Sequence, residues 1–201
     1  MNTMTTVDQP LIERIFTKAR TAHGFLKRPV DDRLLHEIYE IMKWGPTAAN
    51  SCPMRIVFVR DGEAKKRLIS CLHPDNVQQT TEVPVTAIIG FHTRFYEWIP
   101  RLMPAKPELI DDFAGPEKEA IAQAAAFRNS ALQGAYFMLA ARAVGLDCGP
   151  MSAFDPVKLN AEFFPDGEIE VNFLCNLGYG NPGIVLPRAP RFDFEEVCKF
   201  A

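Results

Sequence analysis

Apolar residues recur along the chain at two spacings, one typical of helices and one typical of strands. The three- and four-residue spacing predicts helices over residues 10–22, 31–43, 63–72, 117–144 and 156–164. Short β-prone or continuously apolar runs predict strands over 55–60, 85–91 and 168–180, the last in the centre of a sheet. Because these elements follow no regular βαβ period, the pattern predicts an α+β layered fold and not a doubly wound sheet.

The segments between these elements also carry signals. Asp31 is a candidate N-cap of the second helix, and Gly145 is a candidate C′ residue of the longest one. The polar stretch 74–84 reads as a connection with one helical turn, and CGPMSAFD at 148–155 reads as a turn. Prolines interrupt residues 95–115, which predicts a loop or short helices covering a site.

Composition places the chain among ordinary globular proteins. Its 201 residues are 47% apolar and 23% charged, which predicts a single domain over 1–201 with a substantial core. The N-terminus has no secretory pattern and no apolar run reaches membrane-spanning length, so we expect a cytoplasmic protein that binds no membrane. The net charge of -3 gives no reason to expect nucleic acid as a partner.

Cysteine and histidine spacing argues against metal chemistry and against a disulfide framework. The five cysteines are odd in number and form no CxxC pair, and the four histidines show no ligand spacing. We therefore predict no metal site.

Two other kinds of motif match the sequence poorly. GYGNPG at 178–183 matches GxGxxG, but prolines follow it where a dinucleotide site needs a helix to begin. A plain turn at a strand end is the better interpretation. The sequence contains no GxSxG or SxxK motif, and no cysteine has a recognisable activating neighbour.

The run WGPTAANSCP at 44–53 stands out because it is small, polar and rich in residues with special backbone preferences. Thr47, Asn50 and Ser51 offer hydroxyl and amide groups to a polar ligand. An ordinary helix-to-strand turn has the same composition, and from composition the two interpretations are equally good. Cys52 is expected to be a small apolar contact.

Further polar groups are spread along the chain in a way that suits a flat, phosphorylated ligand. Arginine forks bind phosphate, while amides and free N–H groups bind carbonyl and ring-nitrogen edges. The candidates are Arg20, Thr21, Thr47, Asn50, Ser51, Asn76, Gln79, the turn at 150–155, Arg188 and Arg191.

The order of these groups resembles the nitroreductase family of FMN-dependent oxidoreductases over nearly the whole chain. RTAH at 20–23 stands in place of the family's Arg-Ser-x-Arg motif, and PTAANSCP at 46–53 matches its Pro-Ser-x-x-Asn-x-Gln-Pro loop. PMSAFD at 150–155 matches a Pro-x-x-Gly-Phe-Asp turn, and RAPR at 188–191 matches a basic residue before a proline. His23, Cys52 and Ala153 depart from the family pattern.

The resemblance implies a mostly antiparallel central sheet flanked by helices, and an intertwined homodimer with an FMN at each of two shared sites. Arg20, Thr21, Arg188 and Arg191 would hold the phosphate and ribityl chain, and Thr47, Ala48 and Asn50 would come from the neighbouring subunit. Asn76 would read the pyrimidine edge, and the N–H groups of Ser152 and Ala153 would approach N5 and O4. The full implied set of cofactor contacts is Arg20, Thr21, His23, Thr47, Ala48, Asn50, Asn76, Gln79, Pro150, Met151, Ser152, Ala153, Arg188 and Arg191.

Within the family, the sequence of the second half of the chain, with FRNSALQGAYFMLAARAVGLDCGPMSAFD at 127–155 and NLGYG at 176–180, resembles the malonic semialdehyde reductase branch. That resemblance implies NADH or NADPH as hydride donor and reduction of the semialdehyde to 3-hydroxypropionate in a ping-pong cycle. Arg94 and Arg128 are candidates for binding the substrate carboxylate, although salt bridging is the more common role of such arginines. A broad nitro or quinone reductase and a non-catalytic flavin-binding protein remain open as alternatives, and no catalytic residue is identified.

Overall fold

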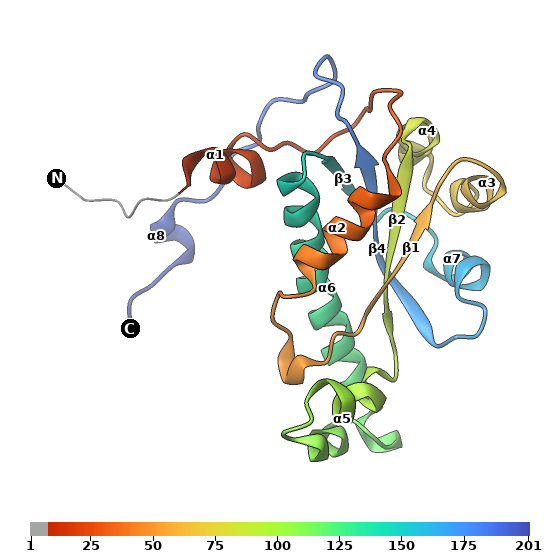
Figure 1. Cartoon of the computed structure of the whole chain (residues 1–201), viewed down its shortest axis with the longest axis vertical. Helices are drawn as coiled ribbons and strands as arrows, with labels where there is room; N and C mark the ends of the chain where they lie inside the picture. Colours follow the sequence, from red (N-terminus) through yellow and green to blue (C-terminus); the bar gives the residue numbers. More distant parts are fainter. Residues whose placement is uncertain (1–7) are drawn as a thin grey trace.

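The computed structural model describes residues 8–201, which build one four-stranded sheet (Figure 1). The strands are β1 (Met54–Val59), β2 (Val85–His92), β3 (Asp147–Met151) and β4 (Ile169–Gly178), in the order β1-β2-β4-β3. Each neighbouring pair is antiparallel. The expected α+β fold, with β4 in the centre, is confirmed.

Helices cover both faces of the sheet (Figure 1). On one face lie α2 (Asp32–Met42) and α6 (Glu119–Ala143), and on the other lie α3 (Glu63–Ile69), α4 (Pro74–Glu82) and α7 (Pro156–Phe163). Side chains alternate along a strand, so Val85, Ala87 and Ile89 of β2 face the first group and Ile88 faces the second. Burial on both faces explains why β2 is apolar on nearly every residue.

The predicted helix ends are borne out where they rest on a capping side chain or a glycine. A carboxylate oxygen of Asp31 accepts a hydrogen bond from the Arg33 N–H at 2.8 Å, as an N-cap does. Gly145 follows α6 with a φ of 90°, a conformation in which glycine carries no steric penalty.

The stretch 74–84 was expected to be a connection with one helical turn, but nine of its residues form α4. Its buried face carries Asn76 and Thr80 in place of apolar side chains. A helix that turns polar groups inward shows no apolar periodicity, which is why the pattern missed it.

The first helix is shorter than expected. Helix α1 (Gln9–Ile12) continues as one π-helical turn over Glu13–Thr17, and the chain is then extended. Arg20 and Thr21 therefore lie beyond the helix, where Thr21 pairs with Cys148 of β3 and the Ala22 N–H donates to the Cys148 carbonyl at 2.9 Å.

Strand β3 was expected to be a turn, because it contains Gly149 and Pro150. Both residue types are rare in central strands, but an edge strand tolerates them. Gly149 is needed here, since a Cβ at this position would lie 2.6 Å from the carbonyl oxygen of Ala22. The missing side chain lets the segment 19–22 run directly beside β3.

The segment between β2 and α6 forms short helical turns, as predicted. They are Phe95–Trp98, α5 (Ile99–Leu102), Pro107–Asp112 and Pro116–Lys118. Phe95 and Ile99 pack with Phe91 of β2 and with two alanines of α6 in a small core of their own. This core holds the segment at the lower end of the sheet in Figure 1.

Both ends of the described chain leave the body of the molecule (Figure 1). Residues 183–201 are exposed throughout, and they carry a one-turn helix, α8 (Phe194–Val197), closed by a capping box between Asp193 and Glu196. No helix within residues 8–201 is long and apolar enough to cross a membrane.

The close contact beside β3 makes a stability prediction. We expect Gly149→Ala to lower the free energy of unfolding by about 1–3 kcal/mol, because the 19–22 segment or β3 must move aside. Gly183→Ala is the control, since its added Cβ would meet only the Asn181 side chain, at 3.3 Å. Chemical denaturation measures both, and equal stabilities would contradict the contact.

Candidate functional site

The first group of candidate residues gathers where the segment 19–22 meets the C-terminal tail. The Arg20 guanidinium donates to the Leu186 carbonyl. Arg188 Nη2 donates back to the carbonyls of Thr17 and Ala19, at 2.8 and 3.0 Å. Neither arginine makes an ion pair within residues 8–201. Arg20 and Thr21 also line a small cavity of about 200 Å³.

The second group surrounds the end of β3. Asn76 of α4 is buried, and its amide Nδ2 donates to the Ala153 carbonyl at 3.0 Å. Gln79 Nε2 donates to Asn76 Oδ1 at 2.7 Å and also contacts the Met151 sulfur. Ser152 and Ala153 are exposed beside these amides. The hydrogen bonds fix the turn after β3 against α4.

Strand β3 joins these two groups along one edge of the sheet. Thr21 pairs with Cys148, and Met151 is three residues further on, about 10 Å along the strand. Cations lie at one end of this edge, and amides with exposed backbone lie at the other. The arrangement suits a ligand with a phosphate at one end and a flat heterocycle at the other.

The third group, Thr47, Ala48 and Asn50, lies at the opposite end of the sheet. The loop runs into Met54, which pairs with Phe91 of β2, whereas Cys148 is level with Val85 through Leu177 of β4. Six residues of strand separate the two levels, about 20 Å. A single chain therefore does not bring this loop to Arg20.

Helix α6 and its preceding segment clamp this loop. Asn129 Oδ1 accepts from the Ala48 N–H at 2.8 Å, and Gln133 Oε1 accepts from the Met54 N–H at 3.0 Å. Asn50 Nδ2 donates to the Leu102 carbonyl at 2.7 Å. These bonds hold three non-glycine residues at positive φ, namely Ala49 at 53°, Asn50 at 48° and Cys52 at 41°. Backbone strain of this kind persists only where surrounding structure enforces it, and it is frequent at functional sites.

Sequence reasoning missed Asn129 and Gln133. Both are buried polar residues in an otherwise alanine-rich helix, and they are one turn apart on the same face. Buried amides need partners, so this pair was the available signal.

Several expected contacts are not brought into these groups. His23 is exposed, and Arg191 donates only to the carbonyls of Ala189 and Pro190. The Cys52 sulfur lies 3.7 Å from both Thr47 Oγ1 and Asn50 Oδ1, so its surroundings are polar and not apolar as expected. Arg94 is paired with Glu168 at 2.7 Å, while Arg128 lies on the exposed side of α6.

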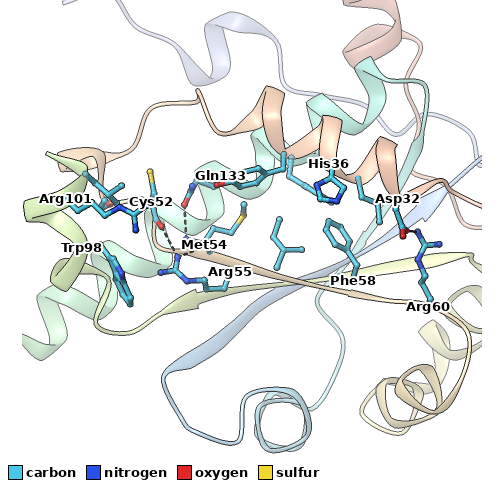
Figure 2. A pocket seen from close by; sticks show the side chains of 16 residues that line it. Asp32, His36, Cys52, Met54, Arg55, Phe58, Arg60, Trp98, Arg101 and Gln133 are labelled. Atoms are coloured by element: carbon cyan, nitrogen blue, oxygen red, sulfur yellow. Dashed lines mark hydrogen bonds and ion pairs between the residues drawn. The ribbon is translucent and has the colours of Figure 1, made fainter.

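A larger cavity of about 680 Å³ opens beside the strained loop, between α2, β1, α5 and α6. Figure 2 shows Cys52, Arg55, Trp98 and Arg101 at one end of it and the paired Asp32 and Arg60 at the other. This volume is typical of small-molecule sites.

The electrostatics of the first end are set by Arg55. Its Nη1 donates to the carbonyls of Cys52, Pro53 and Met54, and its guanidinium stacks on Trp98 at 4.9 Å. Burial lowers the pKa of Arg55 below its ordinary value. Burial, followed by the charge of Arg55, also lowers the pKa of the neighbouring His92. A positive charge without a carboxylate partner therefore lies at this end.

Comparison with known proteins identifies the family. The model of the nitroreductase family matches residues 17–179, so the chain belongs to the nitroreductase family. It is 51% identical to HadB of Ralstonia pickettii over 93% of this chain and 95% of that one, and 48% identical to RSc1004 of Ralstonia nicotianae over 98% and 99%. Both relatives carry provisional names as NADH dehydrogenase/NAD(P)H nitroreductases.

Solved structures share the fold. The nitroreductase ydfN of Bacillus subtilis superposes with a TM-score of 0.84 at 21% identity, over 94% of this chain and 98% of that one. A nitroreductase from Exiguobacterium sibiricum in complex with FMN gives a TM-score of 0.80 at 15% identity, over 100% of both chains. The resemblance in sequence order is thus confirmed at the level of family and fold, while neither the family model nor these relatives name the semialdehyde branch.

The residues along β3 fit FMN by their chemistry. Arg20 and Arg188, which have no acidic partner within residues 8–201, supply cations that suit a phosphate. Asn76 and Gln79 supply amides that suit the edge of a heterocycle. Residues 8–201 contain no group of three or more His, Cys, Asp or Glu side chains placed to hold a metal ion.

The loop clamp predicts a local change. In Asn129→Ala the Ala48 N–H loses its acceptor, so we expect faster amide exchange over 46–53 and a loss of about 1–2 kcal/mol in the free energy of unfolding. Hydrogen exchange with mass spectrometry measures the first effect. Asn172→Ala is the control, because Asn172 binds Ser130 of α6 and not the loop. Unchanged exchange in Asn129→Ala would contradict the clamp.

Proposed function

We propose that the chain is an FMN-dependent NAD(P)H oxidoreductase. One observation carries the proposal: β3 aligns two arginines that have no acidic partner within residues 8–201 with the buried Asn76 amide and the neighbouring Gln79 amide on one edge of the sheet. Family membership, an FMN complex among structures of the same fold and the NAD(P)H in the names of the relatives support it.

The protein's part in this chemistry is to bind and orient. Bound FMN supplies two-electron chemistry, passing a hydride equivalent from NAD(P)H to an acceptor. Arg20 and Arg188 would hold the phosphate, Thr21 the adjoining chain, and Asn76 with the turn 150–153 the ring. No residue is assigned as the proton donor to the acceptor.

For the acceptor we propose malonic semialdehyde, on the resemblance of the second half of the chain to that branch. The aldehyde carbon gains the hydride and its oxygen gains a proton, giving 3-hydroxypropionate, while NAD(P)H becomes NAD(P)⁺. The names of the relatives favour a nitro compound as the alternative acceptor. A flavin carrier without turnover is the remaining alternative.

We further propose that two copies share two FMN sites. Helix α6 has buried residues on one side and exposes Ile121, Phe127 and Leu132, three large apolar side chains that a partner surface would cover. The tail exposes Phe192, Phe194 and Phe200. A second copy would cover these surfaces, and it would bring its strained loop to the arginines that its own chain leaves about 20 Å away.

The cofactor assignment is tested by flavin retention. The purified protein should be yellow and release FMN on denaturation, and Arg20→Ala should raise the dissociation constant of FMN at least tenfold, about the effect of one charge-assisted hydrogen bond. Arg14→Ala is the control, since it also removes an exposed arginine near the N-terminus, but one that donates to the Ala143 carbonyl of α6 and not to the tail. Protein that cannot be reconstituted with FMN would remove the basis of the proposal.

The acceptor is tested by steady-state kinetics. Malonic semialdehyde, nitrofurazone and a quinone are compared with NADH and NADPH, and we expect the highest kcat/KM with the semialdehyde. No preference for it would favour the broad reductase. Bound FMN that neither nicotinamide reduces under anaerobic conditions would favour the flavin carrier.

The dimer is tested by truncation. Removing residues 183–201 should convert a dimer into a monomer, measured by light scattering after gel filtration. Arg188→Ala in the full chain is the control. It should weaken FMN binding and leave the dimer intact, because it removes the phosphate contact and two bonds to the 17–19 backbone but none of the exposed apolar side chains of the tail. A truncated protein that stays dimeric would contradict the role given to the tail.

A further inference from the structure

The large cavity beside the strained loop has a charged end that the FMN residues do not use. Arg55 and Arg101 line it, and neither makes an ion pair within the part of the chain that the structure describes. The Arg60 end differs, because Arg60 is paired with Asp32. The unpaired charge is therefore confined to one end.

A second, independent observation points to a ligand at the same end. Ser51 lines the cavity and is only 2% exposed, and its hydroxyl oxygen makes no hydrogen bond to any residue of 8–201. A buried hydroxyl without a partner costs about 1–3 kcal/mol. A ligand with an acceptor oxygen at this point would offset that cost.

The surrounding structure holds the Arg55 side chain in one position. Three backbone carbonyls and the Trp98 ring hold its guanidinium in place, so it is oriented before any ligand arrives. No carboxylate makes an ion pair with Arg55 within residues 8–201. A half-buried guanidinium in such surroundings is stabilised by an anion.

From this geometry we infer that the end of the cavity formed by Ser51, Arg55 and Arg101 binds the carboxylate of a small organic acid whose other end carries the reducible carbonyl. The inference rests on the proposed function, and it names the group that would select this acceptor. The arginines would receive the carboxylate and Ser51 would donate a hydrogen bond. Arg94 does not serve this role, since Glu168 and Glu97 already pair with it.

The loop before β1 connects the cavity to the proposed flavin wall, the part of this loop that would contact the FMN of a second copy. Thr47, Ala48 and Asn50 are the residues given to the partner's FMN, and the next two residues, Ser51 and Cys52, line the cavity. The Asn50 amide ties the loop to Leu102, the neighbour of Arg101. A carboxylate at this end would thus leave the rest of a short acid near the same wall.

The variants for the test change the charge at Arg101 and leave Arg55 and its contacts unchanged. The Arg101 side chain is exposed and makes no ion pair within the described chain, so Arg101→Gln should fold normally, and Arg101→Lys restores the charge. Lys106→Gln is the control, because it removes an exposed positive charge from the same 95–115 segment outside the cavity.

Two readouts on the holoprotein decide the matter. In kinetics, Arg101→Gln should raise KM for malonic semialdehyde about tenfold or more and leave KM for an uncharged quinone unchanged, with Arg101→Lys between the two proteins. In calorimetry, malonate, an unreactive acid, should bind the wild-type protein and bind Arg101→Gln at least tenfold more weakly. Lys106→Gln should match wild type in both.

Contrary outcomes separate the two levels of the proposal. Equal effects of Arg101→Gln on both acceptors, or malonate that binds neither better nor worse in the variant, would overturn the carboxylate site. Protein that reduces no acceptor would overturn the proposed function, and malonate binding would then still test the site. If malonate binds only after removal of residues 183–201, the cavity is covered by the tail of a second copy and the inference is wrong.

Discussion

The placement of the arginine cluster depends on one close approach, that of the 19–22 backbone to β3. The Ala22 N–H bonds the Cys148 carbonyl, and the Ala22 carbonyl lies where a side chain at position 149 would be. This contact extends the sheet edge by a short stretch of chain and fixes Thr21 against Cys148. This contact places Arg20 beside the tail carbonyl that it binds, and it places Arg188 beside the 17–19 backbone. One glycine thus sets the position of the two cations.

Helix α6 plays the corresponding part at the other end of the sheet. Its apolar face packs on β2, while Asn129 binds the loop before β1 and Gln133 binds the first residue of β1. Rigid helix and strand ends thus hold a loop that would otherwise relax from its positive φ values. The same loop carries the proposed flavin wall on one side and the cavity on the other, so both depend on two hydrogen bonds from one helix.

Sequence patterns predicted most of the scaffold and fewer of the contacts. Strands β1, β2 and β4 and the helices α2, α6 and α7 follow from periodicity, because their apolar side chains face a core. Strand β3 and α4 did not, since the first contains Gly149 and Pro150 and the second buries Asn76. Both failures fall at the candidate site, where polar or backbone requirements replace apolar ones. The roles of Asn129 and Arg55 needed coordinates, because their partners are backbone atoms, which are distant in the sequence for Asn129 and lie in the adjoining turn for Arg55.

The helix α8 has a consequence for how the tail would reach a receiving surface. Four residues cannot sustain a helix on propensity, because nucleation is unfavourable. The reciprocal bonds of Asp193 and Glu196 supply partners for N–H groups that would otherwise be open to water. The tail therefore contains a short helix that does not depend on contacts with the rest of the molecule. Ordering that precedes contact reduces the entropy lost on docking, so a tail that carries α8 would bind a second copy at a lower entropic cost than an unstructured tail.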